Sequence, residues 1–151
     1  MKQFLLILLW FVFNPSDTLT GRVVRVIDGD TIIILLNGNI QERIRLADID
    51  APETGQEYSE QSRLYLSEMV AGKAVQIEYE ERDIYGRILG TIFVDGKNVN
   101  EEMVHAGLAW EYKYNKNAKI RELQKEAQSR GINIWSSKNP IDPYDYRRIK
   151  K

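Results

Sequence analysis

Two turn signals divide residues 18–49 into three apolar segments, and this spacing restricts the fold more than any other feature of the chain. The dipeptides Asp28-Gly29 and Asn37-Gly38 favour tight connections between antiparallel strands. The segments around them are rich in valine and isoleucine, which are typical of strands because branched side chains pack well on a pleated surface. The sequence therefore predicts three consecutive strands in a twisted meander.

The later part of the chain alternates between helical and strand patterns. Residues 56–71 carry apolar side chains at helical spacing, whereas residues 75–80 and 88–94 return to the composition of strands. Asn100 can cap a short helix, and a third helix follows that ends at Gly131. Five strands and three helices in this order predict an α+β fold, with an OB-type β-barrel of five strands and three packed α-helices.

Composition restricts the possible functions. The 151 residues are enough for one domain, and the absence of cysteine excludes disulfides, zinc ribbons and thiol nucleophiles. Any bound metal would therefore be held by oxygen atoms. The formal net charge of −1 gives no overall attraction to polyanions, so nucleic-acid binding would depend on a local cluster of basic residues.

The first residues resemble a targeting segment. Lys2 is followed by the apolar run 4–13 and then by Asn14-Pro15. Ten apolar residues are too few to span a bilayer but fit the apolar region of a secretory signal. We expect residues 1–18 to be a signal peptide and the protein to be exported, to the periplasm or outside the cell. A retained membrane anchor and a buried N-terminal strand remain open, because no cleavage motif of small residues follows.

The leader and the composition of the C-terminus set the expected domain boundaries. Residues 19–138 would form the folded domain, and residues 139–151, which read NPIDPYDYRRIKK, would form a proline-containing basic tail. Nothing in the pattern requires a protein partner, so we expect a monomer.

Charged residues stand where the predicted strands end. Taken singly, each charged residue is explained by a turn or by a solvated strand face as well as by a functional role. Taken together they fit phosphodiester hydrolysis, which requires a hard cation, guanidinium donors and a base. Asp30 and Asp50 offer oxygen ligands to calcium, Arg45 and Arg87 can grip phosphate oxygens, and Glu53 can take a proton from water.

This hypothesis imposes a geometric condition on RIRLADIDAPE, residues 43–53. In a regular strand Arg45 and Asp50 would point to opposite faces of the sheet and could not meet. The strand must therefore end or bend between Leu46 and Asp50. Ala51-Pro52 favours a turn at this point.

Five motifs occur in a fixed order between residues 20 and 136, and this order resembles the staphylococcal nuclease (thermonuclease) family. They are VIDGDT, RLADIDAPE, DIYGR, VNEEMVHAGLAW and NIWS. The resemblance implies a calcium-dependent nuclease on an OB barrel with three helices, which cuts DNA and RNA. It also implies that Asp30 and Asp50 bind the metal, together with the main-chain carbonyl of Ala51.

The resemblance assigns the remaining roles as well. Arg45 and Arg87 would hold the phosphate, and Glu53 would be the general base. Tyr85, Tyr112 and Tyr114 would line the nucleotide pocket, although packing at the edge of the barrel is an alternative for these rings.

Two other functions remain open at this point. One is a non-catalytic module of the same fold that binds nucleic acid or another partner, but such a module would be expected to lose acids or arginines that are present here. The other is a structural protein in which calcium stiffens a loop. His105, the only histidine, is expected at the surface or at a helix end.

Overall fold

The computed structural model describes residues 16–151, and the predicted leader lies outside the described residues except for its last three positions. The strands are β1 (Asp17–Asp28), β2 (Thr31–Leu35), β3 (Gln41–Leu46), β4 (Ile49–Asp50), β5 (Ala74–Arg82), β6 (Ile88–Val94), β7 (Lys97–Asn98) and β8 (Trp110–Glu111). The helices are α1 (Ser59–Val70), α2 (Val99–His105), α3 (Ala118–Arg130) and α4 (Pro143–Ile149), with short 3-10 turns at Asn37–Asn39 and Asn133–Ser136.

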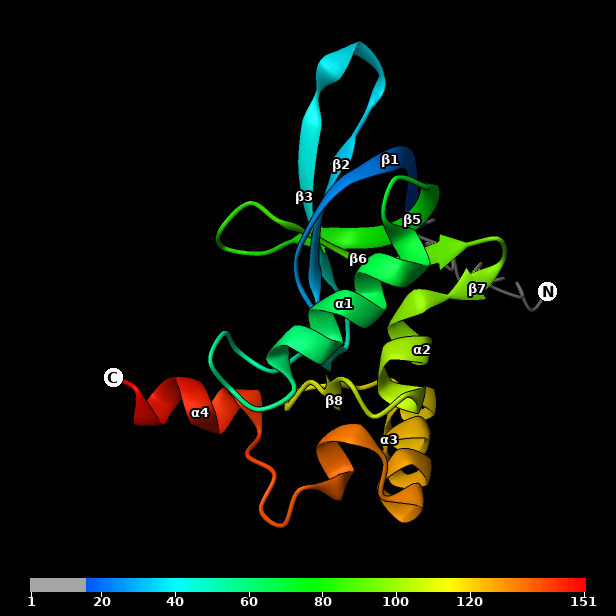
Figure 1. Cartoon of the computed structure of the whole chain (residues 1–151). Coiled ribbons are helices and arrows are strands. Elements are labelled where there is room, and N and C mark those ends of the chain that lie inside the picture. The colour runs from blue at the N-terminus through cyan, green and yellow to red at the C-terminus, as the bar shows by residue number, and fades with distance from the viewer. Residues whose placement is uncertain (1–15) are drawn as a thin grey trace, which may run out of the picture.

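Five strands close into a barrel, so the predicted fold class is confirmed. The strands lie in the order β3-β2-β1-β5-β6, and a parallel pairing between β3 and β6 closes the ring. All other neighbours in the ring are antiparallel. Two register irregularities in β1 increase its twist, which allows one long strand to pair on both sides. Figure 1 shows the β2–β3 hairpin extending away from the helices.

Alternating side chains fill the barrel and bind it to the helices. In β6 every second residue is buried, from Ile88 to Val94. The interior also contains Ile32, Ile44 and Ile77, all of which are fully buried. The apolar cluster continues into α1, α2 and α3, which pack around one side of the barrel (Figure 1). The barrel and the helices therefore share one core, and no helix of residues 16–151 is both long and apolar enough to cross a membrane.

Local signals placed the helices closely but not completely. Helix α1 begins at Ser59, three residues later than the expected range. The cap of α2 is Asn98 and not Asn100, because the side chain of Asn98 accepts the N–H of Glu101. Asn100 is instead buried and bonds to the barrel. Helix α4 is an addition to the three helices expected, since it lies inside the segment interpreted as a basic tail.

Candidate active site

The strand that carries Arg45 ends immediately afterwards, as the hypothesis requires. Strand β3 stops at Leu46, and Asp48 adopts a left-handed backbone with φ of 66°. The chain then forms β4, which pairs with β8 and not with the barrel. This turn brings Asp50 back to the arginine, whose Nη2 lies 3.4 Å from Asp50 Oδ1.

Asp30 lies in the tight loop between β1 and β2. Its Oδ2 accepts the N–H of Ala51 at 2.7 Å, and its Oδ1 accepts the hydroxyl of Thr31 at 3.1 Å. The loop packs closely on α1, because a Cβ atom at Gly29 would lie 1.8 Å from the hydroxyl oxygen of Ser62. Glycine is therefore needed at this position, and the loop is fixed against both α1 and the segment that carries Asp50.

The Arg45 guanidinium joins the two predicted metal ligands. Its Nη1 donates to the carbonyls of Leu46 at 2.6 Å and Ile49 at 2.9 Å. Its Nη2 lies 3.4 Å from both Asp30 Oδ2 and Asp50 Oδ1. The two carboxylates therefore converge on one nitrogen atom, and the arginine side chain is only 13% exposed.

Burial makes this cluster electrostatically demanding. Burial, followed by the charge of Asp30, raises the pKa of Asp28 to about 7. Burial also raises the pKa of Asp50, although two guanidinium groups oppose the shift. Taking several carboxylates out of water favours any cation that can approach them. The site is therefore suited to positive charge, whether from a metal or from a side chain.

Glu53 lies at the edge of the cluster, after the turn through Ala51 and Pro52. Its N–H donates to the side chain of Gln56 at 2.9 Å, which fixes the backbone. Its side chain is 38% exposed and lines the same cleft as the acids. A base in this position is accessible to water.

Arg87 and Tyr85 come from the loop between β5 and β6. Asp83 organises this loop by accepting the N–H groups of Tyr85 and Arg87, and it also accepts the Nε–H of Arg87 at 2.6 Å. The guanidinium carbon lies 5.5 Å from the centre of the Tyr85 ring, which is largely exposed. Among residues 16–151 the terminal nitrogens of Arg87 make no hydrogen bond, so both remain available to a ligand.

Tyr112 and Tyr114 follow β8 and begin an aromatic row. The two rings are 5.7 Å apart at a steep angle, and Tyr114 lies 6.0 Å from Tyr144 of α4. The N–H of Tyr112 donates to the carbonyl of Asp48, which connects this row to the turn before β4. The row therefore flanks the acids.

One cleft of about 1160 Å³ contains nearly all the predicted site residues. Its lining includes Asp30, Arg45, Asp50, Glu53, Tyr85, Arg87, Tyr112 and Tyr114. Ala51 is the exception among the predicted residues, since it is buried behind the cleft with its N–H on Asp30.

The side-chain oxygen atoms of the site fit a hard cation, but only two side chains supply them. Asp30 and Asp50 provide only oxygen atoms, as calcium prefers. No cluster of three or more His, Cys, Asp or Glu side chains in the described part of the chain is arranged as a metal site. Since calcium takes six to eight oxygens, the rest would come from a main-chain carbonyl and from water.

Arg147 is a site residue that sequence reasoning missed. Its Nη1 and Nη2 donate to the two carboxylate oxygens of Asp50 at 2.9 and 2.8 Å, and Nη1 also donates to Glu53 Oε1 at 2.6 Å. The sequence predicts only a basic tail for the run RRIKK, which contains this residue. Asp142-Pro143, a helix cap followed by proline at the first helical position, is the signal that could have revealed α4.

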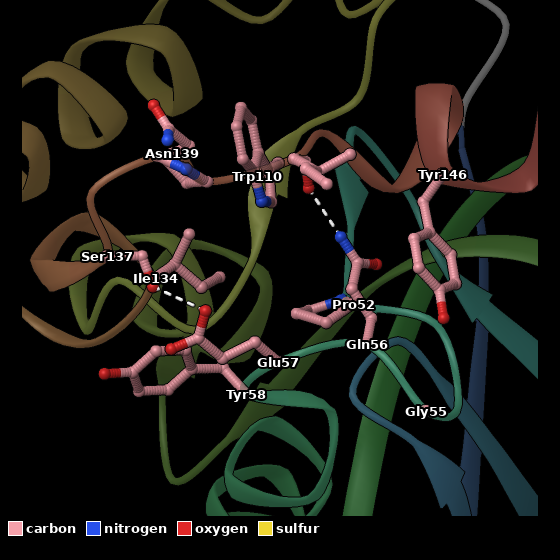
Figure 2. A pocket seen from close by; sticks show the side chains of 12 residues that line it. Pro52, Gly55, Gln56, Glu57, Tyr58, Trp110, Ile134, Ser137, Asn139 and Tyr146 are labelled. Atoms are coloured by element: carbon pink, nitrogen blue, oxygen red, sulfur yellow. Dashed lines mark hydrogen bonds between the residues drawn. The ribbon is translucent and has the colours of Figure 1, made fainter. Parts of the chain in front are cut away.

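A second, smaller pocket of about 140 Å³ lies where the segment before α4 meets the loop before α1. Figure 2 shows Ser137 bonded to Glu57, and Tyr146 extending from α4 toward the loop that contains Gly55. Gln56 Nε2 donates to the carbonyl of Ile141 at 2.5 Å. These contacts fasten the C-terminal segment to the body of the protein beside the cleft.

Comparison with known proteins agrees with this geometry. Residues 43–137 match the family model described as "Staphylococcal nuclease homologue". The chain is 46% identical over 132 residues to an "Uncharacterized endonuclease" of Escherichia coli, with 86% of each chain covered. It is 41% identical over 133 residues to a protein of the same description from Haemophilus influenzae, which covers 87% of this chain and 75% of the relative. A "Micrococcal nuclease" of Shigella flexneri is 38% identical over 143 residues, covering 87% and 82%.

Proposed function

Since the chain belongs to the staphylococcal nuclease family and is a nuclease, we propose that it hydrolyses phosphodiester bonds with calcium, two arginines and a glutamate base. The observation that carries this proposal is the single cleft, into which four separate segments bring Asp30, Arg45, Glu53 and Arg87. Because these residues are far apart in the sequence, a shared cleft is a condition that the chemistry requires and that local patterns alone do not guarantee.

Asp30 and Asp50 would hold calcium, together with the main-chain carbonyl of Ala51. When bound, calcium supplies positive charge that stabilises the oxygens of the phosphate as their negative charge increases. The proposal is supported by the convergence of both carboxylates on Arg45 Nη2, which shows that their oxygen atoms face one small region of positive charge.

Arg45 and Arg87 would bind the non-bridging phosphate oxygens. Two guanidinium groups suit a charge that is spread over several oxygens, since each can donate two parallel hydrogen bonds. Arg87 has both terminal nitrogens available, whereas Arg45 is held by two carbonyls and would position its second nitrogen beside the acids. Glu53, at the exposed edge, would accept the proton of the attacking water.

The tyrosines would contact the nucleotides on either side of the bond. Tyr85 and Tyr114 are 78% and 61% exposed, so their rings are free to stack on bases of DNA or RNA. Tyr112 lines the same cleft, and its ring lies 5.7 Å from that of Tyr114. This mechanism needs no protein partner, and we expect the enzyme to act as a monomer.

The test compares Glu53→Gln with Glu57→Gln in the purified protein, using single-stranded DNA and RNA with and without a calcium chelator. Glu57 is a matched control because it lies four residues away and outside the cleft. We expect the first variant to lower kcat by about 10²- to 10⁴-fold and the second to retain activity. Full activity in Glu53→Gln would overturn the base, and full activity in the chelator would overturn the calcium assignment.

We also propose that the protein is exported through its first 18 residues. The support is the apolar run 4–13. Asp17 and Thr18, the last two residues of that predicted leader, pair with β5, so a cleavage site before Asp17 would leave the barrel whole. N-terminal sequencing of protein recovered from the periplasm and the medium tests this. An intact Met1 on protein in the cytoplasm alone would contradict it.

A further inference from the structure

Helix α4 brings a third guanidinium group to the proposed active site. Figure 1 shows α4 beside the loop that leads from β4 into α1. Arg147 donates to both oxygens of Asp50 and to one oxygen of Glu53, at 2.6 to 2.9 Å. These residues are 97 and 94 positions apart in the sequence. The contact is therefore a tertiary feature of the fold.

The geometry of this contact is that of a strong ion pair. The Asp50 side chain is only 2% exposed, and the arginine fork meets its two oxygens in parallel. Such bidentate, charge-assisted pairs are among the strongest hydrogen bonds in proteins. The local charges explain why they form, because the only other guanidinium paired with Asp50 within residues 16–151 is that of Arg45, which Asp50 shares with Asp30. Arg147 supplies the missing positive charge.

This positive charge lies where the proposed cation would bind. Asp50 Oδ1 already accepts from Arg147 and lies near Arg45, and its Oδ2 accepts from Arg147. A carboxylate oxygen has two lone pairs and could accept a second partner. However, the positive charge of a guanidinium group repels a metal ion that approaches the same oxygen. A metal that bonds to Asp50 would therefore have to displace at least one of the two nitrogen atoms of Arg147.

The rest of α4 is built so that it can release this arginine. Upstream, the segment is fastened by Gln56 on the Ile141 carbonyl, and Asp142 caps the helix by accepting the N–H of Tyr144. Downstream, residues 148–151 are exposed. A helix of seven residues has little stability of its own, so its last turn can unwind while its start stays attached.

We propose that Arg147 competes with the divalent cation for Asp50, so that α4 acts as a latch on the metal site. This inference rests on the proposed role of Asp50 as a ligand. The latch lowers the apparent affinity for the metal, and it keeps Glu53 in an ion pair until the metal releases it. The chain thus sets the calcium concentration at which the nuclease becomes active.

The test measures calcium binding by isothermal titration calorimetry in the wild-type protein, Arg147→Ala and Arg148→Ala. Arg148→Ala is the matched control, because this substitution removes the same formal charge from the next position of α4. The Arg148 side chain contacts the Tyr144 ring and has no hydrogen bond to Asp50 or Glu53. We expect Arg147→Ala to lower the Kd for calcium by about tenfold or more, since a charged hydrogen-bonded pair no longer competes. Arg148→Ala should change it by less than about threefold.

A second measurement uses the wild-type protein without substitution. Calcium should increase amide hydrogen exchange in residues 144–149, because the helix loses the contact that holds its last turn. Equal affinity of the wild type and Arg147→Ala, or unchanged exchange on calcium binding, would overturn the latch alone. Absence of calcium binding in all three proteins would overturn the calcium assignment and the latch together.

Discussion

The buried side chain of Asn100 supports the turn that precedes Asp50, and its replacement by alanine tests this support directly. Its Oδ1 accepts the N–H of Ile92 at 3.1 Å. Its Nδ2 donates to the carbonyls of Ala47 at 2.9 Å and Gly90 at 3.1 Å. One residue of α2 thus connects β6 to the first residue after β3.

The expected loss of stability follows from the groups that alanine would leave unpaired. The carbonyl of Gly90 keeps a partner, since it also accepts the N–H of Ala47 at 2.9 Å. The N–H of Ile92 and the carbonyl of Ala47 each lose a hydrogen bond inside the protein, and a buried group without its partner costs about 1 to 3 kcal/mol. The two unpaired groups together should therefore lower the free energy of unfolding by about 2 to 6 kcal/mol.

Urea unfolding followed by circular dichroism measures this difference, with Asn98→Ala as the control. Asn98 is only partly buried and caps α2 through one bond to Glu101 at 3.1 Å, so its loss should cost about 1 kcal/mol. Equal losses in the free energy of unfolding of the two variants would show that Asn100 does not bridge β6 and the turn after β3.

Three further predictions concern the cleft. Gly29→Ala should lower the free energy of unfolding by about 1 to 3 kcal/mol in urea titration, because its Cβ would lie 1.8 Å from Ser62 Oγ, and unchanged stability would contradict the close packing. Tyr85→Ala should change the free energy of unfolding by less than about 0.5 kcal/mol, because the ring is largely exposed. It should weaken the binding of single-stranded DNA by roughly 1 to 3 kcal/mol in anisotropy titrations. Unaltered binding would show that Tyr85 does not contact the nucleotides. For the wild-type protein in a chelator, the logarithm of the binding constant for single-stranded DNA should fall with the logarithm of the salt concentration, with a slope of about −1.4. This is the value for two phosphate contacts, by Arg45 and Arg87, and a slope near zero would contradict both contacts.

The barrel could be predicted because its signals are local. Asp28-Gly29 and Asn37-Gly38 mark the turns, and segments rich in valine and isoleucine mark the strands on either side. The strand order, however, includes the parallel pairing of β3 with β6, which no local pattern specifies. The bend after Leu46 was predicted only as a requirement of the proposed chemistry.

The missed features depend on tertiary contacts. Asn98 and Asn100 both have side chains that can cap α2. In the fold Asn98 accepts the N–H of Glu101, whereas Asn100 is buried and bonds to the barrel. Arg147 stands in a basic run near the end of the chain, where a solvated role is the ordinary expectation. Its pairing with Asp50 spans 97 positions, so only the folded chain reveals it.

The two-residue pairing of β4 with β8 has a consequence for how the enzyme loses its activity. Strand β4 forms no ladder with the barrel, and it is tied there by side chains such as Arg45 on the Ile49 carbonyl. Proteins open in cooperative units of different stability. We therefore expect the segment that carries Asp50 and Glu53 to open together with β8 at a lower denaturant concentration than the five-stranded ring. Nuclease activity should therefore be lost at a lower denaturant concentration than the one that unfolds the barrel.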